Sequence, residues 1–414
     1  MNWRNGSVKR VLFVINTLGR AGAEIALLEM LRRLDTEQIE IDLYVLTGQG
    51  ELGKELPDHV RLLNRDYSEC SVLSAEGRRK LVRTTCLALF GRGRILRLFP
   101  YLCGNFIQMI MAGKLQKEKL LWRALADAGE RFAQEYDLAV AYLEGGAAYY
   151  VADHVKARKK AAFVHVDYLQ AGYSRKLDRD CYLRFDRIFA VSGEVKDVFL
   201  TVYPECAGRT EIFPVLTDRE RILRMSREEG GFRESQVKDI TENGREIRIL
   251  SVGRLTAQKA YEISIEAMQL LKMQGQRARW YVLGEGEERT KLERRIRELG
   301  LEDDFILLGA AENPYPYMRQ ADIFVQASRF EGKSVAVMEA AILGKPILLS
   351  DRSGNREQIK DGVDGLLCEL TPQAVCSALC RLIQDAALRE RLGHAAMAAG
   401  NQKKEELSKF YELL

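Results

Sequence analysis

The sequence predicts an α/β protein made of two doubly wound domains. Apolar runs of strand length alternate with helical patterns in both halves of the chain, which is typical of parallel sheets buried on both faces. The length of 414 residues exceeds one ordinary core. A polar, charged stretch divides the two halves. We therefore expect two Rossmann-like sheets with a ligand cleft between the domains.

The first half, residues 1–215, begins with strand 11–16, a glycine-bearing turn and a helix through Leu27 and Leu31. Ser192 is a good N-cap for a helix over 194–200. The further strands expected here are 41–46, 138–142, 161–166 and 187–192.

The second half, residues 246–395, repeats the alternation after a linker that we place at 216–245 because it is charged and contains paired glycines. A helix over 289–299 and a C-terminal helix over 396–414, packing back on the first domain, complete this prediction. The expected strands are 247–253, 280–283, 305–308, 323–325 and 346–349.

Composition excludes several classes of function. The net charge of +4 is too small to indicate a nucleic-acid partner. The eight cysteines form no C-x-x-C pair, and the four histidines form no H-E-x-x-H motif, so no catalytic metal is expected. Without a visible secretory signal, we expect a reducing, cytoplasmic location.

Residues 78–123 interrupt the α/β alternation. They hold eleven Lys or Arg and one acid, Glu118, interleaved with apolar residues. Pro100 and Gly104 break the apolar run, which is too short to span a bilayer. One interpretation is a basic amphipathic insert on an anionic membrane surface, which would place the protein at the inner face of the plasma membrane. The other is a helical subdomain with a solvated basic face.

Two carboxylates indicate a sugar-binding turn. Glu331 follows the strand 323–325, and Glu339 lies one turn into a helix that starts near Ser334. Unpaired backbone N–H groups at such a helix N-terminus bind phosphate, whereas carboxylates suit sugar hydroxyls. The combination predicts a nucleotide-sugar pocket, with two solvated surface glutamates as the alternative.

Two cations follow the first strand of the second half. Arg254 and Lys259 lie in the loop at its carboxyl end, where they can neutralise a pyrophosphate leaving group without a metal. Exposed loop cations are the alternative interpretation.

The segment Ser251-Val252-Gly253-Arg254-Leu255 with Lys259, joined to Glu331 and Glu339, resembles retaining glycosyltransferases of the GT-B fold, family four of the sequence-based classification. The glycine turn 18–24 resembles that family's first loop. Segments 163–168, 313–318 and 330–334 resemble its bacterial capsule, exopolysaccharide and teichoic-acid branch. The resemblance covers about residues 10–412.

The resemblance implies roles for individual residues. Arg254 and Lys259 would hold the donor diphosphate, Glu331 the transferred sugar and Glu339 the ribose hydroxyls. His165, which is otherwise a structural histidine, would contact the sugar near its anomeric carbon. The other donor-binding residues implied are Gly22, Gly253, Gly284, Gly309, Gly332, Lys333, Ser334 and Val335.

The sequence departs from the family pattern in four places. Ala21 and Ala260 stand where glycine is usual, Lys333-Ser334 replaces an aromatic or leucine and a glycine or proline, and Phe213-Pro214-Val215 replaces an Asn-bearing turn.

The activity implied is metal-independent, retaining transfer from a nucleotide-diphosphate sugar, with UDP favoured, to a lipid-linked or cell-surface polysaccharide acceptor. No further cofactor is expected. The alternatives are a GT-B relative such as a sugar-nucleotide epimerase, and a non-catalytic sugar-nucleotide-binding or scaffold protein.

Overall fold

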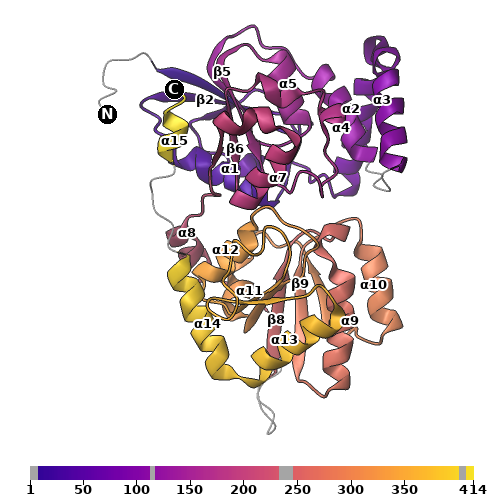
Figure 1. Cartoon of the computed structure of the whole chain (residues 1–414), viewed down its shortest axis with the longest axis vertical. Helices are drawn as coiled ribbons and strands as arrows, with labels where there is room; N and C mark the ends of the chain where they lie inside the picture. The colour runs from indigo at the N-terminus through magenta and orange to yellow at the C-terminus, as the bar shows by residue number, and fades with distance from the viewer. Residues whose placement is uncertain (1–7, 112–116, 233–245, 401–406) are drawn as a thin grey trace. The chain divides into compact units, whose positions relative to one another are not determined.

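Two separate parallel β-sheets organise the chain (Figure 1). This computed structural model describes residues 8–111, 117–232, 246–400 and 407–414. The chain divides into one unit of Met1–Leu216 with Lys404–Leu414 and a second of Thr217–Lys403. The predicted α/β class with two doubly wound sheets is confirmed.

The first unit contains a seven-stranded sheet in the order β3-β2-β1-β4-β5-β6-β7, with parallel neighbours throughout. The order reverses between β1 and β4. Every residue of β1 from Val11 to Ile15 is fully buried, as expected for a central parallel strand. The strands are β1 (Lys9–Ile15), β2 (Ile39–Val45), β3 (Val60–Leu62), β4 (Tyr136–Ala141), β5 (Ala157–Val164), β6 (Arg187–Ala190) and β7 (Thr210–Ile212).

Helices surround this sheet. Ser192 caps α7 as predicted, because its Oγ accepts a hydrogen bond of 3.2 Å from Val195 N. The helices are α1 (Gly22–Arg33), α5 (Gly146–His154), α6 (Arg175–Asp178), α7 (Gly193–Val202) and α15 (Ser408–Tyr411), with 3-10 turns η1 (Glu51–Glu55), η3 (Cys181–Arg184) and η4 (Pro204–Arg209).

The basic insert forms three helices between β3 and β4: α2 (Ala75–Phe90), α3 (Arg94–Met111) and α4 (Lys117–Ala128), with η2 (Gly91–Gly93) joining the first two. They gather at one side of the first unit (Figure 1). Arg123 of α4 is buried, pairs with Asp153 and donates to Asp178 O at 2.9 Å, so α4 is held in the core. Residues 112–116 of the predicted insert lie outside the described residues. Within the described ranges no helix is long and apolar enough to cross a bilayer.

The predicted helix over 396–414 differs from the structure. Residues 396–399 end α14 (Ala386–Ala399) in the second unit, 401–406 lie outside the described residues, and α15 belongs to the first unit. The Phe410 ring stacks on Phe13, with 5.8 Å between ring centroids. Burial of both rings anchors α15 to β1.

The second unit contains a six-stranded parallel sheet in the order β10-β9-β8-β11-β12-β13, which reverses between β8 and β11. The strands are β8 (Ile247–Val252), β9 (Ala278–Leu283), β10 (Phe305–Gly309), β11 (Ile323–Gln326), β12 (Ile347–Ser350) and β13 (Leu366–Cys368). The helical elements are α8 (Arg219–Met225), η6 (Ala257–Lys259), α9 (Tyr261–Met273), α10 (Arg289–Glu298), α11 (Tyr315–Gln320), α12 (Val335–Ile342), α13 (Pro372–Gln384) and α14.

Alternate residues of these strands enter two different cores. Ile249 and Trp280 pack with α9, α10 and α13. Their neighbours Leu250 and Tyr281 pack with α8, α11, α12 and α14. Because successive side chains of a strand point to opposite faces, the sheet is covered by helices on both sides.

The predicted linker at 216–245 differs from the structure in its first half. Residues 217–232 belong to the second unit and include α8. Ile222 and Phe232 are buried in its core, and the Phe232 ring lies 4.5 Å from Tyr281. Residues 233–245 lie outside the described residues.

Candidate functional site

Lys259 and Glu331 meet where the strand order of the second sheet reverses. Lys259 ends η6, in the loop after β8, and Glu331 lies in the loop after the neighbouring strand β11. Lys259 Nζ donates a hydrogen bond of 2.7 Å to Glu331 Oε1, and only 14% and 8% of the two side chains are exposed. Such a reversal is where open α/β sheets bind ligands. The structure thus brings together Lys259, which was predicted to bind the diphosphate, and Glu331, which was predicted to bind the sugar.

Backbone contacts hold these loops together. Arg329 N donates to Gln258 O at 2.8 Å, and Gln258 Nε2 donates to Phe330 O at 2.9 Å. Glu331 N donates to Ser353 O at 3.1 Å, which adds the loop after β12. A Cβ on Gly354, whose φ is +82°, would lie 2.2 Å from Glu331 O. Glycine is therefore required for this close approach.

The N-terminus of α12 carries the backbone donors expected to bind phosphate. Its N-cap, Ser334, makes no side-chain cap, and its backbone N–H donates instead to Gln358 Oε1 at 2.9 Å. The Ser334 hydroxyl donates to Gln326 Oε1 at 3.0 Å. Gln326 is buried, and its Nε2 has no hydrogen-bond partner among the described residues. The Gln358 side-chain carbonyl thus accepts from the Ser334 N–H, which is one of the donors of the expected anion site.

Glu339 is buried within α12, where the sequence placed it. Its Oε1 accepts a hydrogen bond of 2.8 Å from the Tyr315 hydroxyl of α11. Sequence reasoning had found Tyr315 only as part of the family-like segment 313–318. Neither Tyr315 nor Gln358 was assigned to the site, because both act through contacts with residues 24 positions away.

Three predicted donor glycines lie at the carboxyl ends of adjacent strands. Gly253 N donates to Leu283 O and Gly284 N to Gly309 O, both at 2.9 Å. Gly284 has φ +156°, and a Cβ there would lie 1.9 Å from Gly253 O. Gly284 is therefore needed for the close packing of two backbone segments.

The remaining predicted residues of this unit lie beside the pair. Arg254 is exposed, and its guanidinium has no hydrogen-bond or ion-pair partner within the described part of the chain. Gly332, Ser334 and Val335 are buried, and Lys333 is half-buried. Arg254 is thus the more accessible cation, whereas Lys259 is already engaged by a carboxylate.

The two departures from glycine have different backbones. Ala21 has φ −133° and is extended, so its Cβ causes no strain. Ala260 has φ +49° and ψ +39°, the left-handed region, and is fully buried. A methyl group in that conformation is strained by roughly 1–2 kcal/mol.

His165 and Gly22 belong to the first unit. His165 follows β5, its backbone N–H donates to Glu144 Oε1, and Val166 N donates to the same atom at 3.0 Å. Burial lowers the pKa of His165 to about 4, although a hydrogen bond with the Tyr142 backbone acts to raise it. The ring is therefore neutral near pH 7. Its Nε2 is buried and has no partner among the described residues. Gly22 is exposed and begins α1.

Asp127, Asp153 and His154 are one group of possible metal ligands in the described ranges, with ligand atoms within 4.8 Å of one another. Arg123 and Arg184 pair with Asp153, and His154 Nε2 lies 3.0 Å from Asp127 Oδ1. These cations neutralise the cluster, which we assign to structure. Metal independence of the reaction stays a prediction.

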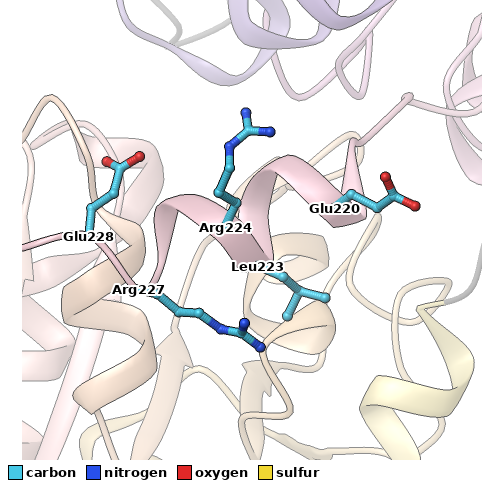
Figure 2. Close-up of a pocket in the computed structure, with 5 residues that line it drawn as sticks. All are labelled: Glu220, Leu223, Arg224, Arg227 and Glu228. Atoms are coloured by element: carbon cyan, nitrogen blue, oxygen red, sulfur yellow. The ribbon is translucent and has the colours of Figure 1, made fainter.

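A pocket of about 460 Å³ lies along α8 and is lined by Glu220, Leu223, Arg224, Arg227 and Glu228 (Figure 2). None of the residues that line it was predicted to belong to the site, and neither Lys259 nor Glu331 is among them. We assign it no function.

The family model described as "Glycosyl transferases group 1" matches residues 232–398, almost the whole second unit. The second unit is a group 1 glycosyltransferase domain. The amylovoran biosynthesis glycosyltransferase AmsK of Erwinia amylovora is 38% identical to this chain over 147 residues. The match covers 33% of this chain and 36% of that protein. A Campylobacter jejuni N-acetylgalactosaminyltransferase acting on a diphospho-undecaprenol-linked sugar is 36% identical over 144 residues, 34% of this chain and 39% of that protein. The matches therefore span less than half the length of these relatives.

Several solved structures resemble nearly the whole chain in fold. Anabaena Alr3699/HepE in complex with UDP and glucose has a TM-score of 0.68 at 16% identity, covering 98% of this chain and 100% of that one. The trehalose-6-phosphate synthase OtsA has a TM-score of 0.67 at 13% identity, covering 98% of both chains. These likenesses show the GT-B fold, as predicted.

Proposed function

We propose that the protein is a retaining glycosyltransferase that transfers a sugar from a UDP-sugar to a lipid-linked or cell-surface polysaccharide acceptor. The observation that carries this proposal is the buried pairing of Lys259 with Glu331 at the strand-order reversal of a group 1 glycosyltransferase domain. A cation and a carboxylate fixed side by side suit a ligand that has a diphosphate next to a sugar.

The donor roles follow from the chemistry of each group. Lys259 and Arg254 neutralise the departing diphosphate, and the N-terminus of α12 adds backbone N–H donors. Glu331 Oε2 has no hydrogen-bond partner in the described part of the chain and accepts from a sugar hydroxyl. Glu339, held by Tyr315, accepts from the ribose hydroxyls. The roles that the resemblance implies for His165 and Gly22 stay predictions.

We propose a same-face reaction, since no carboxylate suited to attack the opposite face of the sugar was found in the sequence. The bond from the anomeric carbon to the phosphate oxygen breaks while the acceptor oxygen bonds to the same face of that carbon. The departing phosphate oxygen takes the proton of the acceptor hydroxyl. Charge neutralisation by Lys259 and Arg254 favours departure of the diphosphate without a metal ion.

UDP is favoured because the HepE, TarM and pneumococcal GtfA structures are described as complexes with UDP. A lipid-linked or polysaccharide acceptor is favoured by the names of the Campylobacter and Erwinia relatives. We place the enzyme in the cytoplasm at the inner face of the plasma membrane, where a lipid-linked acceptor would present its sugar.

The test is a thermal-shift and hydrolysis screen of the purified protein against UDP-, GDP-, ADP- and CMP-sugars, with a chelator present. Stabilisation by one UDP-sugar, with slow release of UDP, supports the proposal. Proton NMR of the first sugar released or transferred then gives its anomeric configuration. Inversion, or no response to any nucleotide sugar by a folded protein, would overturn the retaining transferase in favour of another mechanism or of a scaffold.

A further inference from the structure

Exposed large hydrophobic side chains are concentrated on the insert. Nine of the sixteen found among the described residues lie between Val82 and Met111, in α2 and α3. Scattered exposed hydrophobic residues are ordinary, but a contiguous group marks a surface for a partner or a membrane.

The side of α3 that faces solvent is its apolar side. Leu96, Phe99, Cys103, Ile107 and Ile110 are spaced by three or four residues and so share one face. Leu96 is 79% exposed, Phe99 61%, Ile107 57% and Ile110 55%. We call these five residues the outer face of α3. A helix that packs by its apolar side would show the opposite arrangement.

The buried side of α3 is a stripe of Leu98, Tyr101, Asn105 and Met109, and it is anchored by polar contacts. The Tyr101 hydroxyl donates to Leu177 O at 3.0 Å, and the Arg179 guanidinium lies 4.6 Å from the Tyr101 ring centroid. These contacts fix α3 to α6. The outer face therefore stays exposed while the helix is firmly held by the first unit.

The charge around the outer face is positive. The sequence from 77 to 117 contains nine Lys or Arg and no Asp or Glu. Arg97 is exposed on a flank of α3, and Lys176 Nζ donates to Gly104 O at 3.0 Å, two turns further along that flank. Arg78, Arg79 and Arg83 are exposed on α2. An apolar face bordered by cations suits an interface of acyl chains and anionic headgroups.

We propose that the outer face of α3 inserts into the surface of an anionic lipid bilayer, with Arg97 and Lys176 at the level of the headgroups. Insertion covers Leu96, Phe99, Ile107 and Ile110 and leaves the anchoring stripe in place. The membrane location of the proposed enzyme would rest on this face. Liposome binding needs neither donor nor acceptor, so it succeeds or fails independently of transferase activity.

The test is flotation of the full-length protein with phosphatidylcholine vesicles, with and without phosphatidylglycerol. We expect binding to the anionic vesicles only. Replacing Phe99→Asp and Ile107→Asp together should lower the partition coefficient at least about tenfold, because two apolar side chains are lost from the inserted face and two negative charges meet anionic headgroups. Arg97→Gln should lower it about fivefold. Met273→Asp, at a 77% exposed position on α9, is the matched control and should bind like the wild type.

The variants concern exposed side chains, so their unfolding temperatures should match that of the wild type, and a thermal melt checks this. Unchanged binding of the double variant, or equal binding to neutral and anionic vesicles, would overturn the proposal. So would lipid-independent self-association that the double variant abolishes, because the outer face would then bind a second copy of the chain.

Discussion

Lys259 donates to Glu331 over 2.7 Å between loops that are 72 residues apart in sequence. The contact joins the carboxyl ends of two strands that are neighbours only because the order of the sheet reverses there. The cation proposed to neutralise the leaving group is therefore held in place by the carboxylate proposed to bind the sugar.

Arg254→Ala and Lys259→Ala should both reduce turnover by roughly 10²–10³, by analogy with the loss of one oxyanion donor. Their effects on stability should differ. Arg254 is exposed, so its loss should leave the free energy of unfolding unchanged. Loss of Lys259 leaves Glu331 buried without its partner and should cost up to about 3 kcal/mol. Steady-state kinetics and urea denaturation measure the two quantities, and near-normal turnover of both variants would remove the diphosphate assignment.

Ala260→Gly should stabilise the protein by about 1 kcal/mol, because glycine adopts the left-handed conformation of residue 260 without strain. Ala267→Gly, at a buried position inside α9, should instead destabilise it by about 1 kcal/mol. Thermal unfolding of the two variants makes the comparison. A loss of stability in both would show that the Ala260 methyl contributes more by packing than it costs in strain.

His165 should make the fold less stable in acid. The folded-state pKa of about 4 lies below the ordinary 6.5, so between these pH values the unfolded chain binds a proton that the folded chain does not. Stability falls as the pH is lowered through this window, by about 2 kcal/mol between about pH 7 and pH 5. Urea denaturation of His165→Asn should lack this loss. An identical pH dependence in the variant would contradict a buried neutral ring.

Asp178 should act in the opposite direction. Burial raises the pKa of Asp178 to about 7. A 2.6 Å hydrogen bond from the Tyr149 hydroxyl and the charge of Arg123 both act to lower it, but burial has the larger effect. The folded chain then binds a proton more readily than the unfolded chain, so stability rises as the pH falls from about 7 towards 4. Asp178→Asn keeps an oxygen that can accept from the Tyr149 hydroxyl. Without the opposing effect of Asp178, the variant should show the full decrease in stability at low pH that His165 causes. If the variant is no more acid-sensitive than the wild type, Asp178 is ionised in the fold.

Gln358→Ala should tighten binding of a nucleoside diphosphate by up to about fivefold, because Gln358 Oε1 competes for the Ser334 N–H at the start of α12. Gln320→Ala, which removes a side chain that contacts Phe232 N in the same unit, is a control for general effects on stability. Isothermal titration with UDP gives the affinities. Weaker binding in Gln358→Ala would assign Gln358 to positioning of the loop instead of competition.

The strands that sequence reasoning found are the long apolar ones, because burial on both faces leaves continuous runs such as Val11–Ile15. It missed β3, β7 and β13, which have three residues each and lie at or near sheet edges. It also placed α8 in a linker, because four of its seven residues are charged. Little in the sequence indicated that Ile222 of this helix would be buried.

The site was predictable where loop chemistry is local. Lys259 and Glu331 each follow a recognisable strand, and parallel strands end at one edge of a sheet. Tyr315 and Gln358 could not be found in this way, because their hydrogen bonds to Glu339 and Ser334 depend on how α11 and the loop after β12 pack against α12.

The return of α15 to the first unit means that the chain passes between the units twice, once after Leu216 and again before Lys404. A single protease cut at either passage would leave the halves covalently joined by the other. The second unit is one uninterrupted stretch of sequence, but the first unit is not. A gene fragment ending near residue 400 would therefore lack Phe410 and leave the Phe13 ring without its stacking partner. Separate expression of the first unit would need the last eleven residues supplied in cis or as a peptide.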